Sequence, residues 1–280
     1  MCEPGLVAEL FAPEDARRRP AMMALGGSEG GLQGARILAA ALAMAGFPTL
    51  AVAYFNEVGL PDALEAIPLE TFGRALAWLA AQDSVDADRI GVVGASKGAE
   101  AALQFASRWP QIKAVVVGAA THVGWQGINR RSWARVSSWT HQGRELPFVA
   151  YRGMPNPFAS LGAFYAKSLA AADNTEAATI PVEAIGGPVL LVSGGRDSMW
   201  DASQMSRAVT GRLDARGFTH RVVHLDYPDA GHLAFGAPIP LGHPARRMLG
   251  RFGGSVSTNA AAREDSWPRI VAFLKEVLGA

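Results

Sequence analysis

Residues 94–98 read Gly-Ala-Ser-Lys-Gly and match the pattern G-x-S-x-G. The apolar run 90–93 comes before this pattern, and a helical pattern comes after it. That context is typical of a serine on a tight, strained turn from a strand into a helix, which lifts the hydroxyl into an open crevice. Side chains in place of the two glycines would collide with the neighbouring strand and helix, or with the turn itself. Ser96 is therefore a candidate nucleophile, and the alternative is a capping serine in an ordinary glycine-rich turn.

A serine hydroxyl is a weak nucleophile that needs a base, and the base needs an orienting carboxylate. Around turns of this kind, the order along the chain is serine, then acid, then histidine. Asp197 comes just after the strand-like run 188–192, and His232 lies in the loop after the run 220–225. Because both side chains fall at strand ends in the required order, the sequence predicts a triad of Ser96, Asp197 and His232.

Two other aspartates compete for the role of the acid. Asp201 precedes a helical pattern that starts at Ala202, and we expect it to cap that helix. Asp229 is expected to be a turn residue in the stretch YPDAG. The remaining histidines have other places in the chain. His122 and His141 lie in the irregular stretch 119–185, His220 and His224 lie on the last strand-like run, and His243 comes after a proline-rich loop.

A tetrahedral intermediate needs hydrogen-bond donors for its oxyanion. The glycine-rich stretch GGSEGG, residues 26–31, follows the strand-like run 21–25, where a second backbone N–H is expected. The N–H of Ser28 or Glu29, together with that of Lys97, would bind the oxyanion. A phosphate-binding loop is the competing interpretation, but the charge of Glu29 and the lack of a following Lys-Ser/Thr disfavour it. No metal-ligand motif is visible, so we expect neither a metal nor another cofactor.

The elements that must position these residues alternate along the chain. Strands are predicted at 6–11, 21–25, 49–53, 89–93, 112–117, 188–192 and 220–225. Helices are predicted at 33–45, 69–81, 97–108, 202–215 and 266–278. Regular alternation implies an α/β fold, with a mostly parallel central sheet flanked by helices on both faces.

The alternation stops between residues 119 and 185, where Trp, Pro, Arg and Gly occur without clear strands. We interpret residues 119–185 as a cap inserted in one domain that comprises residues 1–280. The aromatic residues of the cap are expected to pack it onto the sheet, and some of them to line an apolar acyl pocket.

Composition and charge bear on the expected binding partners and on the cellular compartment. The 280 residues are 49% hydrophobic and carry a formal net charge of +1, which gives no electrostatic case for nucleic acid or an anionic membrane. Gly46, Phe47 and Pro48 interrupt the longest uncharged stretch, 37–55, so no membrane span is expected. A single cysteine, Cys2, and a first segment without a signal-peptide pattern favour the cytoplasm. The oligomeric state does not follow from the sequence.

Four stretches together resemble the C-terminal catalytic domain of the acyl-CoA thioesterase / bile acid-CoA:amino acid N-acyltransferase family: GGSEGG, VDADRIGVVGASKGAEAAL, IPVEAIGGPVLLVSGGRDSMWDAS and DYPDAGHL. The resemblance implies an α/β-hydrolase fold, and it implies a triad that carries over onto Ser96, Asp197 and His232. The acyltransferase branch of the family uses a cysteine nucleophile, so Ser96 favours hydrolysis over transfer to an amine.

The expected activity is therefore that of a serine hydrolase that cleaves acyl thioesters through an acyl-enzyme. A carboxylesterase, an acyl-CoA N-acyltransferase and a non-catalytic binding protein of the same fold are the alternatives. The stretch 119–160 contains several arginines, among them Arg130, Arg131 and Arg135, and its only acidic residue is Glu145. Because the planar guanidinium of arginine binds phosphate well, these arginines suit the phosphates of coenzyme A. We expect these three arginines to bind the substrate, and the alternative is a solvated surface patch.

Overall fold

Eight strands of the computed structural model form one large sheet. The structure describes residues 2–3, 5–13, 17–129, 131–132, 134–153 and 160–280. In this part of the chain the strand order is β1-β2-β4-β3-β6-β7-β10-β11. The strands are β1 (Cys2–Glu3), β2 (Leu6–Phe11), β3 (Arg19–Leu25), β4 (Thr49–Ala53), β6 (Val85–Ala95), β7 (Ile112–Gly118), β10 (Val189–Gly194) and β11 (Val222–Tyr227).

All neighbours from β4 to β11 in this sheet are parallel, whereas β2 pairs antiparallel with β4, and β1 with β2. The mostly parallel central sheet predicted from the alternating pattern is therefore confirmed. Strand β4 is buried along its whole length, because helices cover both faces of the sheet.

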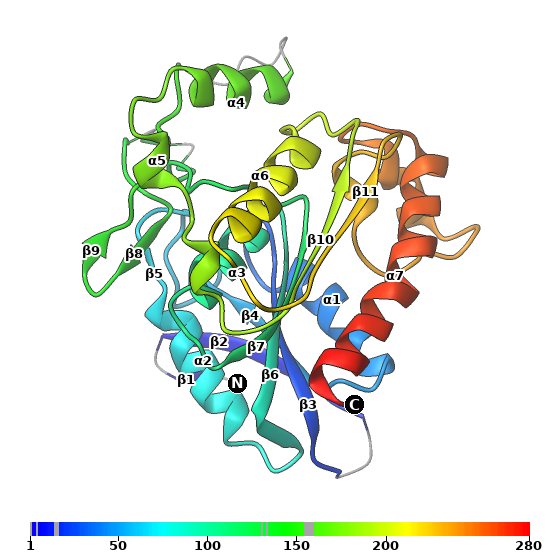
Figure 1. Cartoon of the computed structure of the whole chain (residues 1–280). Helices are drawn as coiled ribbons and strands as arrows, with labels where there is room; N and C mark the ends of the chain where they lie inside the picture. Colours follow the sequence, from blue (N-terminus) through cyan, green and yellow to red (C-terminus); the bar gives the residue numbers. More distant parts are fainter. Residues whose placement is uncertain (1, 4, 14–16, 130, 133, 154–159) are drawn as a thin grey trace.

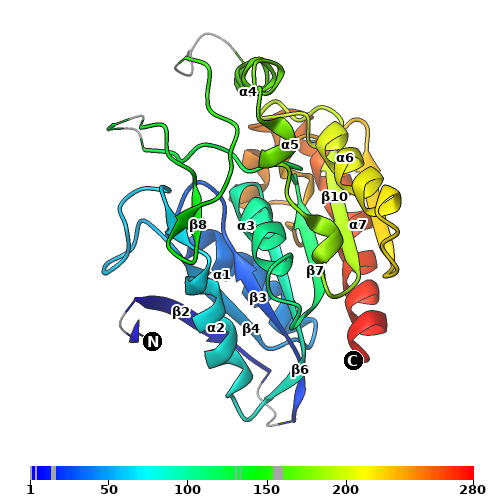
Figure 2. The same cartoon turned by 60° about the vertical axis from the view of Figure 1, so that its left-hand side comes forward.

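Helices form a layer on each side of the sheet (Figure 1). The apolar faces of α1 (Gln33–Met44) and α7 (Val256–Leu278) pack in one core cluster with Met22 and Val93. Three helices belong to the other layer, which Figure 2 shows in front of the sheet: α2 (Glu70–Ala80), α3 (Lys97–Ala106) and α6 (Ala202–Ala215). No described helix is long and apolar enough to cross a membrane.

The described part of 119–185 contains short elements beyond the main sheet. A small three-stranded sheet joins β5 (Ile67–Pro68), β8 (Trp139–His141) and β9 (Arg144–Glu145). It is followed by α4 (Leu161–Ala170), α5 (Thr175–Ala178) and the 3₁₀ turn η1 (Val182–Ala184). In both views α4 lies at the top, the side toward which the parallel strands point their carboxyl ends (Figures 1 and 2).

The last helix differs from the sequence-based prediction. It begins at Val256 and not at Ser266, and a capping box between Ser255 and Thr258 fixes its start. The added turns bury Asn259 and Arg263 on their inner face, where an amphipathic helix is expected to carry apolar residues. Pro268 lies inside the helix without ending it.

Candidate active site

Ser96 lies on a strained turn between β6 and α3. Its backbone angles are φ 57° and ψ −123°, a conformation that side-chain-bearing residues rarely adopt. A Cβ at Gly94 would overlap the carbonyl of Gly98, and a Cβ at Gly98 would overlap the carbonyls of Leu25 and Gly26. The two glycines of the G-x-S-x-G pattern therefore let strand, turn and helix approach one another.

The N–H of Lys97 is available close to this serine. Lys97 is the first residue of α3, and the first N–H groups of a helix have no partner within it. The backbone of Ser96 is held from the other side, because its N–H donates to the carbonyl of Gly118 at 2.9 Å. An anion that forms at the Ser96 hydroxyl would therefore lie next to a free donor at a helix N-terminus.

Asp197 and His232 are hydrogen-bonded. His232 Nδ1 lies 2.7 Å from Asp197 Oδ2, and the Asp197 side chain is only 1% exposed. The other carboxylate oxygen accepts the N–H groups of Met199 at 2.8 Å and Trp200 at 3.3 Å. Since a carboxylate can only accept, Nδ1 of His232 carries a proton in this hydrogen bond, and Nε2 is the other ring nitrogen of the imidazole. Asp201 instead caps α6 by accepting the N–H of Gln204 at 2.9 Å, as predicted.

Two aromatic rings and one backbone bond fix the His232 ring. The rings of Trp200 and Phe252 lie nearly perpendicular to it, with ring centroids 5.4 Å and 6.2 Å away. The N–H of His232 donates to the carbonyl of Phe252 at 3.0 Å, and Trp200 Nε1 donates to the carbonyl of Ala119 at 3.2 Å. The imidazole is therefore oriented by packing as well as by Asp197.

Ser96 and His232 line one cavity of about 600 Å³, which we call the Ser96 cavity. Its wall is formed by loop 26–29, α1 and the segment after His232. The large apolar side chains in this wall are Leu25, Ile37, Leu38, Met199, Leu233, Phe235, Ile239, Met248, Leu249 and Phe252. A crevice of this size with an apolar wall and a few polar groups suits a small ligand with a hydrocarbon part.

The origin of this wall differs from the expectation for the aromatic residues of 119–185. None of the described residues of that segment lines the Ser96 cavity, whereas Tyr165 lines a separate cavity that contains Asp197. Trp133 and Phe158 lie outside the described residues. Trp125, Tyr151 and Tyr165 pack on one another and on Trp200 instead. The wall segment 233–252 contains only the short 3₁₀ turns η2 (His232–Ala234) and η3 (Pro244–Gly250). Its apolar residues therefore follow neither a helical nor a strand period. The one sequence feature that could have indicated a cavity wall is the large number of apolar residues among its glycines and prolines.

Loop 26–31 is held against the nucleophile. A Cβ at Gly27 would lie 3.4 Å from Cβ of Ser96, and both Ser28 and Glu29 line the Ser96 cavity. The Tyr54 hydroxyl donates to the carbonyl of Gly26 at 2.6 Å, and Glu29 Oε1 accepts the N–H of Gly27 at 2.9 Å. Burial raises the pKa of Tyr54 well above its usual value, so its hydroxyl stays a neutral donor. The loop is thus fixed before any substrate arrives.

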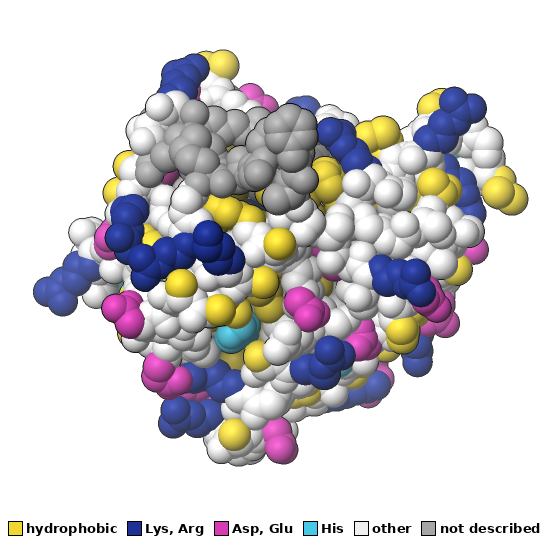
Figure 3. All heavy atoms as spheres, turned by 90° about the horizontal axis from the view of Figure 1, so that it is seen from above, with side chains coloured by type: hydrophobic (Ala, Val, Ile, Leu, Met, Phe, Trp, Pro, Cys, Tyr) yellow, Lys and Arg dark blue, Asp and Glu magenta, His cyan; other side chains and the backbone are white. Residues whose placement is uncertain are grey.

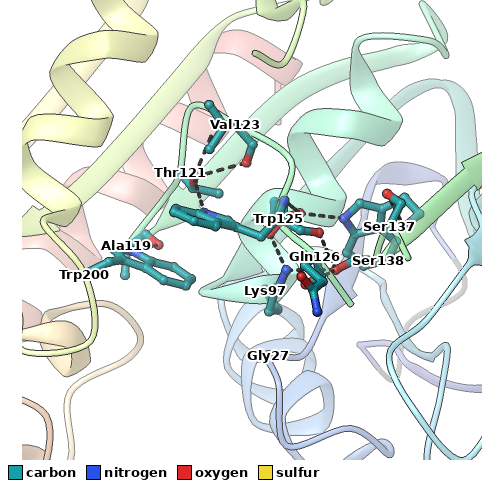
Figure 4. Close-up of polar contacts among 12 residues, drawn as sticks. Gly27, Lys97, Ala119, Thr121, Val123, Trp125, Gln126, Ser137, Ser138 and Trp200 are labelled. Atoms are coloured by element: carbon teal, nitrogen blue, oxygen red, sulfur yellow. Dashed lines mark hydrogen bonds and ion pairs between the residues drawn. The ribbon is translucent and has the colours of Figure 1, made fainter. Parts of the chain in front are cut away.

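The Lys97 side chain points away from solvent into a buried polar network (Figure 4). Its Nζ donates to Glu100 Oε2 at 2.8 Å and to Ser138 Oγ at 2.9 Å. Glu100 Oε1 accepts the N–H of Trp125 and the Nε1–H of Trp139, each at 2.8 Å. Burial lowers the pKa of Lys97, and the neighbouring carboxylate opposes this shift. The two members of this ion pair lie within α3, and their hydrogen bonds to Ser138, Trp125 and Trp139 tie the first turn of α3 to residues 125–139. The sequence did not reveal this network.

Removing one partner of this buried pair is expected to destabilise the fold strongly. Glu100→Ala leaves the Lys97 ammonium buried without a counter-charge, which costs about 3–5 kcal/mol of unfolding free energy. Urea unfolding followed by tryptophan fluorescence measures the loss. Asp86→Ala is the matched control, because Asp86 pairs with Arg89 at the same spacing but near solvent. Equal losses in the two variants would contradict the assigned role of the buried pair.

Of the three arginines predicted to bind the substrate, the structure describes two. Arg131 is exposed, lies 3.8 Å from Asp62 and lines a second cavity of about 690 Å³, which we call the Arg131 cavity. This cavity also contains Ser28 and Glu29, so it adjoins the Ser96 cavity. Arg135 is exposed, and Arg130 lies outside the described residues. Seen from above, this side of the molecule carries interspersed basic and acidic side chains (Figure 3).

Comparisons with known proteins place the chain in a family. Residues 67–280 match the family model described as BAAT / Acyl-CoA thioester hydrolase C terminal. The chain belongs to this family. It is 31% identical over 275 residues to the mouse bile acid-CoA:amino acid N-acyltransferase, with 96% of this chain and 62% of the relative covered. It is 28% identical to human acyl-coenzyme A thioesterase 1, with 96% and 63% covered.

These family members are longer than the chain, which spans less than two thirds of their length. Among solved structures, a dienelactone hydrolase-like promiscuous phosphotriesterase from metagenomic libraries superposes with a TM-score of 0.58 at 17% identity. That match covers 97% of this chain and 92% of the other. The fold is therefore the α/β-hydrolase fold, as the resemblance implied. In the described part of the chain, no cluster of His, Cys, Asp and Glu could hold a metal ion.

Proposed function

We propose that the protein is a serine hydrolase of acyl thioesters, with Ser96 as nucleophile, His232 as base and Asp197 as the orienting acid. One observation carries the proposal. Ser96, on its strained turn, lines the same cavity as His232, and the imidazole is hydrogen-bonded to the buried Asp197 carboxylate. A histidine oriented in this way can activate the Ser96 hydroxyl if its Nε2 accepts the hydroxyl proton, and this is the mechanism we propose.

In the first half of the reaction, Ser96 Oγ attacks the acyl carbon while His232 Nε2 takes the hydroxyl proton. The charge that develops on the carbonyl oxygen is stabilised by the N–H of Lys97 and by that of Ser28 or Glu29. The tetrahedral intermediate collapses, the carbon–sulfur bond breaks, and the thiolate leaves with the proton from His232. The acyl group is then an ester of Ser96.

In the second half, His232 Nε2 takes a proton from water, and the resulting hydroxide adds to the acyl carbon. The intermediate is stabilised by the same donors, and Ser96 leaves with the proton held on His232. Asp197 stabilises the imidazolium in both halves through the hydrogen bond at Nδ1.

Labelling by a fluorophosphonate probe tests the nucleophile, and a substrate panel tests the reaction. The panel contains acyl-CoAs and simple esters of the same acids, with and without an added amino acid, because one relative is named as an N-acyltransferase. We expect labelling of Ser96 and release of free acid from thioesters. Amide as the main product would favour the acyltransferase alternative, and turnover of esters alone would favour the carboxylesterase alternative. A folded protein without labelling and turnover would be a binding protein.

The leaving group is proposed to lie on the side of residues 119–185, which we propose act as a cap. Ile128, Asn129 and Arg131 of this segment line the Arg131 cavity, which adjoins the Ser96 cavity at Ser28 and Glu29. The acyl chain would then occupy the apolar Ser96 cavity, and the polar thiol that is released would leave through the Arg131 cavity, beside the proposed cap.

Neutralising Arg130, Arg131 and Arg135 together is expected to raise KM for an acyl-CoA about 10-fold, because phosphate contacts with the arginine fork are lost. Added salt should raise the same KM in the wild type, since exposed ion pairs are screened. An uncharged thioester of the same acyl group is the control substrate, and Arg144→Gln, on the exposed strand β9, is the control variant. If both substrates respond alike, these arginines do not bind coenzyme A.

A further inference from the structure

Arg263 is a buried cation in the wall of the Ser96 cavity. It lies in the part of α7 that the sequence pattern missed, and it is only 8% exposed. The cavity wall around it is mainly apolar, and the same cavity contains Ser96 and His232. A charged side chain in such a place is unusual, because burial of an unpaired charge is costly.

The hydrogen bonds of Arg263 all go to neutral acceptors. Its Nε donates to the carbonyl of Ala237 at 2.9 Å, and its Nη1 donates to those of Phe235 at 2.6 Å and Leu233 at 3.4 Å. The remaining nitrogen, Nη2, has no hydrogen-bond partner within the described residues. It lies against Gly236, which has φ +117° and whose missing side chain leaves the space for it.

No carboxylate of the described residues forms an ion pair with this guanidinium. Burial lowers the pKa of Arg263 to about 10, with no neighbouring acid to oppose the shift, so the group is still charged at neutral pH. The other charged side chains at the cavity are Glu29, whose carboxylate accepts the N–H of Gly27 beside Ser96, and Arg251, which is exposed over the ring of Phe252. The cavity therefore holds a buried positive charge whose anion is missing from the described residues.

We propose that Arg263 binds a carboxylate at the far end of the acyl group, so that the preferred substrates are thioesters of dicarboxylic acids. This proposal rests on the proposed function, because it needs the thioester carbonyl at Ser96. The apolar wall between the two ends suits a methylene chain, and one free guanidinium nitrogen suits a small anion. Burial strengthens the attraction between the two charges.

The test compares two thioesters of one acid, the free ω-carboxylate and its methyl ester, in a series of succinyl, glutaryl, adipyl and longer acyl groups. For at least one length, the wild type is expected to show a KM about 10- to 100-fold lower for the carboxylate. Arg263→Gln is expected to abolish this preference. Because Arg263 also holds the loop after His232, the methyl ester measures the structural loss in that variant. Arg251→Gln, at the exposed cation of the same cavity, should keep the preference.

Equal KM values for the carboxylate and the ester at every length in the wild type would overturn the proposal. So would an equal loss on both substrates in Arg263→Gln. Either result, with thioesters still hydrolysed, leaves the proposed function intact. If Arg263→Gln does not fold, or no thioester is turned over, calorimetry on the wild type decides. Free dicarboxylates should then bind, with an affinity that falls as salt is added, and monocarboxylates of the same length should not bind. Equal affinities for the two kinds of acid would refute the inference.

Discussion

Ser96→Ala is expected to lower turnover of a good thioester by about four to six orders of magnitude. The covalent step is lost, whereas the cavity and the oxyanion donors remain, because they are backbone N–H groups. Steady-state hydrolysis, measured by release of the thiol, gives the ratio of rates. Fluorophosphonate labelling should disappear in the same variant.

The matched control for this variant is Ser28→Ala. Ser28 lines the same cavity, but only its N–H has a proposed role, and alanine keeps that group. Its activity should therefore stay close to that of the wild type, and circular dichroism should be unchanged in both variants. Near-normal turnover in Ser96→Ala would end the serine-hydrolase proposal.

Asp197→Asn is expected to lower kcat about 10⁴-fold. The amide that replaces Oδ2 can donate to Nδ1 of His232, which moves the ring proton to Nε2 and removes the base. The fold should persist, since the amide oxygen can still accept the N–H groups of Met199 and Trp200. Turnover under substrate saturation, together with thermal unfolding, separates the catalytic loss from a structural one.

Asp201→Asn provides the comparison, because Asp201 is four residues away and caps α6. Asparagine caps helices about as well as aspartate, so both stability and kcat should change little. Should Asp201→Asn prove severe and Asp197→Asn mild, the acid would be misassigned while the serine mechanism would stand.

Local patterns predicted most of the fold. Strands Leu6–Phe11 and Thr49–Ala53 and helix Ala202–Ala215 have the predicted limits, because their period and end signals lie within their own residues. The start of α7 was missed, since its first turns bury Asn259 and Arg263 where a pattern search expects apolar residues. Asn259 is buried because it bridges loops, accepting the N–H of Gly231 and donating to the carbonyls of Leu249 and Gly253.

Some features of the candidate site were likewise predictable from the sequence, and others were not. The order of Ser96, Asp197 and His232 and their places after strands are readable in the chain, and the structure brings Asp197 and His232 within hydrogen-bond distance. Their catalytic roles, the oxyanion donors and the binding role of the arginines remain predictions. The acyl wall was expected in residues 119–185, whereas much of the wall of the Ser96 cavity comes from residues 233–252. That segment has no α-helix or strand whose period could have marked it.

By itself, the sequence determined the turn at Ser96 and the alternation that builds a parallel sheet. Both follow from short-range sterics and from the spacing of apolar residues, which need no knowledge of distant neighbours. Only the tertiary structure decided where Lys97 and Arg263 point. One cation is buried against Glu100 and the other against backbone carbonyls in the cavity wall. Whether a buried charge has a partner depends on segments that meet only on folding, so no local pattern encodes it.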